Sequence, residues 1–216
     1  MSEPRAMAER LEQVAAGIWR WHVLDERIDF ESDAHAVSAE AGTVLIDPLP
    51  LHDEALRPLQ PIAAICLTAA CHQRSAWRYR KASGARVYAP EGSREMDEEP
   101  DVRYRDGERL PGGLVAVHAP GPDEAHYAFL RQAAPAVLFC PDLVMRDRTG
   151  ALTFVPAEYH EDPQATRDSV RRLLDLSFDI LCFDHGAPIT DKPHAALRAL
   201  LAGTATALPR TAVNDA

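Results

Sequence analysis

The sequence predicts an α/β sandwich, a fold in which two β-sheets pack face to face and helices cover their outer faces. Two observations predict it. Short strands joined by turns come first along the chain, and strand–helix units follow them. A chain of 216 residues can also bury a sizeable core without disulfides. We therefore expect a single domain over residues 1–216, with a core at about residues 17–203.

Three segments rich in β-branched and apolar residues open the predicted domain. They read IWRWHVL from Ile18, HAVSAEA from His35 and GTVLIDPL from Gly42. The letters SAEAG between the last two are typical of a hairpin connection. The following LHDEALRPL predicts a short helix, because Asp53 and Glu54 suit the positive end of a helix dipole.

A strand–helix–strand unit comes next. The continuous apolar run IAAICLT indicates a strand buried on both faces, and ARVYAP is the returning strand. Between them, Ser75 is a candidate N-cap for the helix AWRYRKAS, which Gly84 ends. Because a helix joins the two strands, we expect them to run parallel.

The rest of the chain alternates strands and helices after a polar stretch, Glu91–Arg109, whose acidic run Glu95–Asp101 reads as a solvated surface loop. Pro and Gly separate the predicted strands GLVAVHAPG, AHYAFLRQ and AVLFCPDLV. An amphipathic helix, DPQATRDSVRRLLDL, has Asp162 as its expected N-cap. The strand FDILCFDHG and the helix KPHAALRALLAG complete the fold. Residues 1–13 and 209–216 are expected to be frayed.

The composition narrows the classes of function. A net charge of −10 argues against nucleic-acid binding, which needs an excess of Lys and Arg. The sequence has neither an apolar run of about 20 residues nor a signal peptide, so we expect a cytoplasmic protein without membrane contact. Cys66, Cys140 and Cys182 lie in apolar runs and are expected to be buried thiols, whereas Cys71 lies in a polar turn.

Four turns that follow predicted strands carry polar side chains. They read TAACHQR, HAPGPDEAH, CPDLV and FDHGAPI in chain order. Polar groups at the ends of consecutive strands converge on one edge of a sheet, where α/β folds place their sites. We therefore expect the functional site at this edge.

This set of turns, in this order and at these separations, resembles the metallo-β-lactamase-fold superfamily of hydrolases. The resemblance extends from about Gly17 to Gly203 and includes GTVLIDPLP, GARVYAPE and DHGAPI. It implies an αββα sandwich of two mixed sheets. Members of that family typically bind two zinc ions through a Thr-His-x-His-x-Asp-His signature, a Pro-Gly-His turn, an Asp in a Gly-Asp turn and a final His before Gly.

This chain departs from the family pattern at most of the ligand positions. With Thr68 aligned to the Thr of the signature, the His, His, Asp and His positions hold the residues Ala69, Cys71, Gln73 and Arg74. The Pro-Gly-His turn becomes Pro120-Gly121-Pro122. Asp142 and His185 keep the family's ligand types. Since zinc needs about three or four converging N, O or S ligands, no resident cofactor is the preferred prediction.

Two readings of the altered site remain open at this point. One is a single zinc or other divalent ion at a rearranged site drawn from Cys71, His72, Asp142 and His185, with His126 as an outlying candidate. The other is a hypothesis that the guanidinium of Arg74 pairs with Asp142 in the space of the second metal. Further candidates for the cleft are Gln73 and Trp77, although packing is the preferred role for Trp77.

Three functions are compatible with these residues. The preferred one is a hydrolase-like protein, of ester, thioester or amide substrates by resemblance, whose dinuclear zinc site is lost or reduced to one weak site. In that case Asp142, His185, Cys71 and Arg74 are the candidate catalytic residues. The second is a non-enzymatic relative that binds a small molecule or a partner in the vacated cleft. The third is a thiol enzyme in which Cys71 is the nucleophile and His185 the base.

The remaining histidines match no ligand pattern. We expect them to be solvated or bonded locally; they are His22, His35, His52, His118, His160 and His194. Neither the substrate nor the oligomeric state follows from the sequence, beyond a small-molecule ligand or substrate as the expected partner.

Overall fold

Two β-sheets packed face to face form the centre of the computed structural model, which describes residues 3–203. The first sheet contains seven strands in chain order, β1-β2-β3-β4-β5-β6-β7. Their bounds are β1 Glu12–Ala15, β2 Ile18–Asp25, β3 Phe30–Ala39, β4 Gly42–Ile46, β5 Ile62–Cys66, β6 Arg86–Pro90 and β7 Val102–Tyr104. The pairs from β1 to β4 are antiparallel, and those from β4 to β7 are parallel. The sheet is therefore mixed, as predicted.

The second sheet contains five strands in the order β14-β11-β10-β9-β8. They are β8 Arg109–Leu110, β9 Leu114–His118, β10 Tyr127–Arg131, β11 Val137–Phe139 and β14 Ile180–Cys182. Only the β11–β14 pair in it is parallel. A separate hairpin of β12 Val144–Arg146 and β13 Leu152–Phe154 follows β11, and the sequence had not indicated it.

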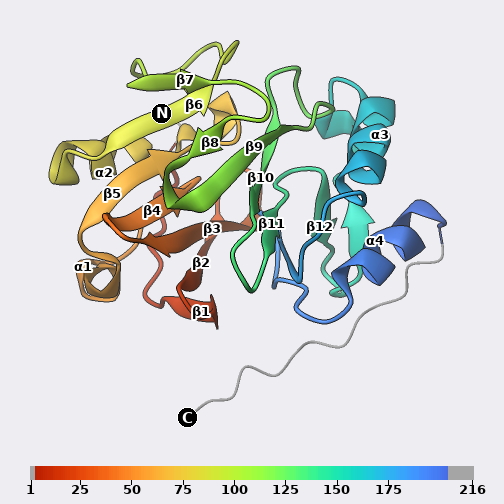
Figure 1. The fold of residues 1–216 in the computed structure, drawn as a ribbon, viewed down its shortest axis with the longest axis horizontal. Coiled ribbons are helices and arrows are strands. Elements are labelled where there is room, and N and C mark those ends of the chain that lie inside the picture. Colours follow the sequence, from red (N-terminus) through yellow and green to blue (C-terminus); the bar gives the residue numbers. More distant parts are fainter. Residues whose placement is uncertain (1–2, 204–216) are drawn as a thin grey trace.

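Helices cover the outer face of each sheet (Figure 1). On one side lie α1 Asp53–Leu56, continued by a 3₁₀ turn at Arg57–Leu59, and α2 Ala76–Ser83, which packs against β5 and β6. On the other side lie α3 Pro163–Leu173 and α4 Pro193–Leu201. Four layers leave three interfaces, and the buried apolar side chains form three clusters that match them. This is the expected αββα sandwich.

The middle cluster joins the two sheets. It contains Val44, Ile46 and Cys66 from the first sheet and Phe129 and Phe139 from the second. Successive strand residues point to opposite faces, so Ala34 and Leu45 pack instead with the α2 residue Trp77 in the outer cluster. The continuous apolar run at β5 reflects this burial on both faces.

The helix boundaries agree with the sequence at three caps. The carboxylate of Asp162 accepts hydrogen bonds from the backbone N–H groups of Gln164 and Ala165, and Gly84 ends α2 in the left-handed conformation. Ser75 is the N-cap residue of α2, as predicted, but its hydroxyl bonds no backbone N–H group and instead donates to Glu3 at 2.8 Å. The side-chain capping bond expected of Ser75 is therefore missing, because its hydroxyl is turned toward the N-terminal segment.

The N-terminal segment is more ordered than the sequence indicated. Ala8 exchanges backbone hydrogen bonds with Pro50 and His52, and β1 begins at Glu12. The prediction that residues 1–13 are frayed was wrong for the described part, since this segment pairs with the chain beside α1. The other expected frayed end, residues 209–216, lies outside the described residues. Within residues 3–203, no helix combines the length and apolar character needed to cross a membrane.

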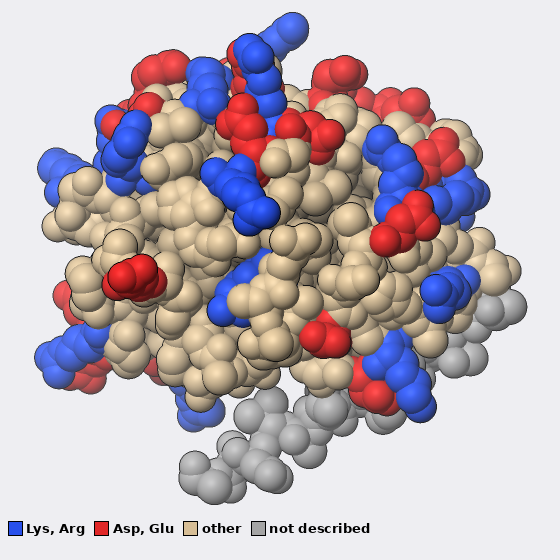
Figure 2. All heavy atoms as spheres, viewed as in Figure 1, with Lys and Arg blue, Asp and Glu red and all other residues tan. Residues whose placement is uncertain are grey.

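The acidic run Glu95–Asp101 is a mostly exposed loop, as predicted, and it also makes contacts with α2 and β6. Asp101 accepts from the backbone of Val87, and Arg80 pairs with Glu98 and Asp101. Met96 packs against the outer apolar cluster. The run therefore joins α2 to the β6–β7 edge. Acidic and basic side chains alternate over the face that Figure 2 presents, without a large area of one sign.

Candidate functional site

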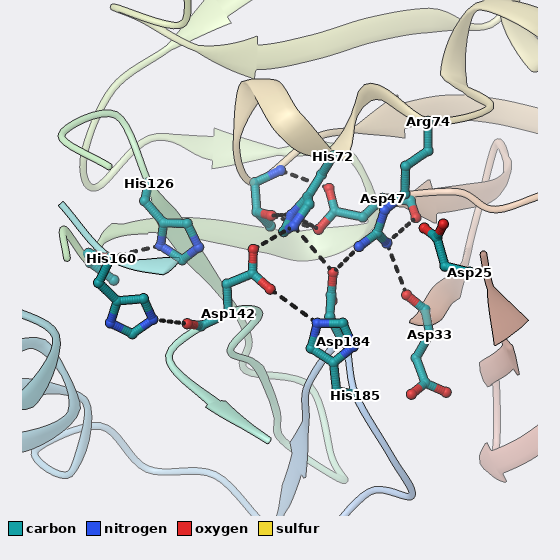
Figure 3. Close-up of polar contacts among 12 residues, drawn as sticks. Asp25, Asp33, Asp47, His72, Arg74, His126, Asp142, His160, Asp184 and His185 are labelled. Carbon is teal, nitrogen blue, oxygen red and sulfur yellow. Dashed lines mark hydrogen bonds and ion pairs between the residues drawn. The ribbon is translucent and has the colours of Figure 1, made fainter. Parts of the chain in front are cut away.

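The candidate site lies where strands of both sheets end. Asp47 follows β4, Thr68 follows β5, Asp142 follows β11 and Asp184 follows β14. A 3₁₀ turn at Ala70–Gln73 carries Cys71 and His72 into the same region. The turns that the sequence singled out thus meet at one edge of the sandwich (Figure 3).

The imidazole of His72 is the centre of this cluster. Its Nδ1 donates to the hydroxyl of Thr68 at 2.8 Å and lies 3.2 Å from Asp47 Oδ2. Its Nε2 lies 2.8 Å from Asp142 Oδ2 and 3.5 Å from Asp184 Oδ2. Carboxylates are acceptors only, and the Thr68 hydroxyl already donates to Asp47 at 2.5 Å. Both nitrogens of His72 must therefore donate, and the ring is an imidazolium.

The charges around His72 agree with this assignment. Burial alone would lower the pKa of His72, but Cys71, Asp142 and Asp184 raise it well above its ordinary value. Burial would conversely raise the pKa of Asp142, yet His72 and His185 hold it well below its usual range. The site thus contains an ion pair, with the Asp142 side chain 21% exposed toward the cleft.

Arg74 supplies a second buried cation. Its Nη2 donates to Asp184 Oδ2 at 2.8 Å, and its Nη1 donates to the carbonyl oxygens of Asp33 and Asp47. The hypothesis that Arg74 pairs with Asp142 was wrong in its partner. The turn directs the guanidinium toward β3 and the end of β14, and Asp142 is bonded by the two histidines (Figure 3).

The backbone is strained at three residues of the site. Asp47, Arg74 and Asp142 have φ angles of 46°, 31° and 51°. Aspartate tolerates the left-handed region, but Arg74, with ψ at −111°, lies outside the common regions. Such a conformation persists only where its surroundings hold it, and it is a frequent mark of functional sites.

The other predicted residues fall into two groups. His185 faces Asp142 Oδ1 at 3.4 Å and donates from Nδ1 to the carbonyl of Glu31. Gln73 and Trp77 bond each other at 2.8 Å, and Gln73 also accepts from Asp97. Because this pair ties α2 to the acidic run, the assignment of Gln73 to the cleft was wrong, whereas Trp77 has the packing role that the sequence favoured.

His126 is fully buried next to His72, with 6.4 Å between ring centroids. Its Nδ1 donates to Ala119, and its Nε2 has no partner among the described residues. Burial lowers the pKa of His126, so the ring is neutral and its free nitrogen is an acceptor. His126 is therefore packed beside the cluster and does not line the cleft.

Three residues of the site were not singled out by sequence. Asp47 and Asp184 lie just after the ends of β4 and β14, and this position could have identified them from the sequence. His160 was expected to be solvated or locally bonded, but it donates to the carbonyl oxygen of Asp142. His35 was likewise misjudged. It lies between the sheets against Phe139, because inward positions of β3 are covered by the second sheet.

A cleft of about 610 Å³ opens over the cluster. Its polar lining includes Cys71, His72, Arg74, Asp142 and His185 from the cluster, together with Asp25, Arg27, Asp29 and Arg148. Its apolar and aromatic lining comes from Ile28, Phe30, Met145, Val155, Pro156 and Tyr159. A concave site with both kinds of lining is typical of small-molecule binding.

A family model described as the metallo-beta-lactamase superfamily matches residues 12–204. The chain belongs to this superfamily. No curated protein matches the chain.

Solved structures of the superfamily share the fold. DIM-1 metallo-beta-lactamase superimposes with a TM-score of 0.71 at 14% identity, covering 92% of this chain and 98% of its own. An enzyme from Pontibacter korlensis gives a TM-score of 0.70 at 17% identity, covering 91% and 99%. A protein named TTHA1623, solved in a di-iron-bound form, is 26% identical, with a TM-score of 0.58 over 74% of this chain and 90% of its own.

The residues at the signature's ligand positions decide whether this site can hold the superfamily's metal ions. Ala69 offers no donor atom and Arg74 is a fixed cation, so two of the signature's ligand positions hold no ligand. Cys71, His72 and Asp142 do present donor atoms within 4.8 Å of one another, as do Asp47, His72 and Asp184. Both groups include His72.

Proposed function

We propose that this chain is a small-molecule-binding member of the metallo-beta-lactamase superfamily that works without a dinuclear zinc centre. The observation that carries the proposal is the guanidinium of Arg74, which bonds Asp184 at a position where the family signature has a histidine ligand. A guanidinium has no lone pair to offer a metal ion.

The cluster is balanced by its own side chains. Asp47, Asp142 and Asp184 face the cations of His72 and Arg74, and His185 lies beside Asp142. An isolated buried carboxylate is costly, so a cluster of three requires cations. His72 and Arg74 supply those charges here, and the residues do not fit two zinc ions.

The lining of the cleft supports one class of ligand. Asp142 and the Cys71 thiol offer polar contacts, and Phe30, Met145 and Val155 offer apolar contacts. A volume of about 610 Å³ lies within the range of small-molecule pockets. We infer a ligand of metabolite size that carries both polar and apolar groups.

The thiol reaction is less well supported by this geometry. The imidazole grouped with the Cys71 thiol is that of His72, not the expected His185. Both nitrogens of His72 are already engaged, by Thr68, Asp47 and Asp142, so neither is directed at the Cys71 thiol. Binding in the cleft is therefore the better-supported function.

Metal analysis tests the proposal. Protein purified without chelator and then dialysed against zinc is expected to retain far less than one ion per chain, measured by mass spectrometry of the digested protein. Asp142→Ala should leave that value unchanged. One or two tightly held ions per chain that are lost in Asp142→Ala would overturn the proposal.

A further inference from the structure

A second groove, of about 620 Å³, lies next to the cleft and contains an unpaired guanidinium. The two share Asp29, Phe30 and Arg148 in their walls. The remaining lining comes from β2, the β12 end and the turn after β14, including Arg20, His22 and Arg146. The groove therefore adjoins the candidate site and is distinct from it.

Arg146 is fixed in the wall of this groove. Its Nε donates to the carbonyl oxygen of Ala187, and its Nη1 donates to the carbonyl oxygen of Gly150, both at 2.8 Å. Gly186 lets the side chain pack closely, because a Cβ at that position would lie 2.8 Å from the Cβ of Arg146. The guanidinium is thus held in one orientation before any ligand arrives.

Within residues 3–203, Arg146 has no carboxylate at ion-pair distance. Arg20, by contrast, is neutralised by Glu12 and Asp33. Burial and the charge of Arg20 lower the pKa of Arg146, which is the signature of an uncompensated cation. A half-buried cation without a counter-ion is a binding element for an anion.

The carboxylates in the groove do not supply that counter-ion. Asp147 is engaged by its own turn, accepting from Thr149 and Ala151. Asp29 pairs with Arg148 at 3.4 Å, and Glu31 is exposed. The Nη2 atom of Arg146 has no hydrogen-bond partner in the described part of the chain.

We propose that the groove at Arg146 binds an oxyanion, either a carboxylate or a phosphate group of a small molecule. The planar guanidinium, with two of its nitrogens already bonded to carbonyl oxygens, presents its remaining N–H groups to the anion. Arg148 also lines the groove. The proposal is independent of the metal content of the neighbouring cluster, so the two can fail separately.

Titration with inorganic phosphate and with acetate tests the proposal, with chloride at matched ionic strength as the baseline and calorimetry as the readout. Saturable binding of at least one of the two anions is expected. It should weaken about tenfold or more in Arg146→Gln, because a charge-assisted hydrogen bond is lost. Arg146→Lys keeps the charge and the aliphatic packing but loses the planar fork, so a smaller weakening is expected. Which anion binds more tightly separates phosphate from carboxylate.

Arg171→Gln is the matched control, because Arg171 is an exposed arginine paired with Asp168 on α3. Its affinity for the anion should equal that of the unchanged protein. Absence of saturable binding, or equal losses in the Arg146 and Arg171 variants, would overturn the proposal. If Arg146→Gln does not fold, Arg146→Lys takes its place in the test. An affinity of Arg146→Lys equal to that of the unchanged protein would then overturn the proposal.

Discussion

The guanidinium of Arg74 lies among carboxylates at a position where the family signature has a histidine ligand. Its position follows from the strained turn at Arg74 and from the acceptors that surround it, which are Asp184 and two carbonyl oxygens. His72, one residue beyond the position of the signature's second histidine, is the other cation. A small change of register within one turn therefore places a protonated imidazole between Asp142 and Asp184.

Replacing Arg74 tests the pairing at this scale. Arg74→Met leaves the buried Asp184 without its cation and should reduce the free energy of unfolding by about 3–5 kcal/mol. A double-mutant cycle of Arg74→Met with Asp184→Asn, measured by urea unfolding, should give a larger coupling energy than the cycle with Asp142→Asn. Equal couplings would contradict the assignment of Asp184 as the partner.

Secondary structure elements position the site by where they end. β4, β5, β11 and β14 deliver Asp47, Thr68, Asp142 and Asp184 to one edge, and the outer helices hold these strands from both sides. The helix α3 connects to the cleft through Thr166, whose hydroxyl lies 2.7 Å from His160 Nδ1. Its N-terminal cap therefore supports the position of His160.

Removing that cap is expected to cost stability. Asp162→Ala loses the acceptor for the N–H groups of Gln164 and Ala165 and should lower the free energy of unfolding by about 1 kcal/mol. The exposed Asp168 on the same helix provides the control, since Asp168→Ala removes only exposed contacts with Arg171 and the Gln164 side chain and should cost less than about 0.5 kcal/mol. Urea denaturation of both variants checks the order.

At the scale of the whole molecule, the space between the sheets is mostly apolar and yet contains His35. This histidine is 2% exposed, and its Nε2 has no partner in the described structure. Burial lowers its pKa to about 3, helped by the nearby Arg20 and Arg74 and opposed by Asp47. His35 is therefore neutral in the folded protein over most of the accessible pH range.

Acid should destabilise the fold through His35. Between its ordinary pKa of 6.5 and about 3, the unfolded chain binds a proton there that the folded chain does not. The contribution of His35 is thus complete above pH 6.5 and falls by about 1.4 kcal/mol for each unit below it. His35→Leu should remove that part of the slope in urea unfolding at pH 7.5, 6 and 5. His52→Gln, at an exposed position, should not; identical slopes in all three proteins would contradict this role.

The sequence by itself determined the sandwich, most of its strands and helices, and the edge where the site lies. These follow from apolar periodicity and from turn residues at strand ends, which are local signals. The sequence did not indicate the edge strand at Val102–Tyr104 or the hairpin at Val144–Phe154, because three-residue strands carry little periodic pattern.

Only the tertiary structure decided which charges meet. Residue types showed that Ala69, Cys71, Gln73 and Arg74 replace the signature's ligands. The partners of Arg74 and the protonation of His72 instead depend on contacts between both sheets, from 25 residues of chain apart for His72 and Asp47 to 112 for His72 and Asp184. Asp47, Asp142 and Asp184 come from three different strand ends, and their distances to His72 exist only once the sandwich has closed. The same closure left Arg146 with carbonyl partners alone.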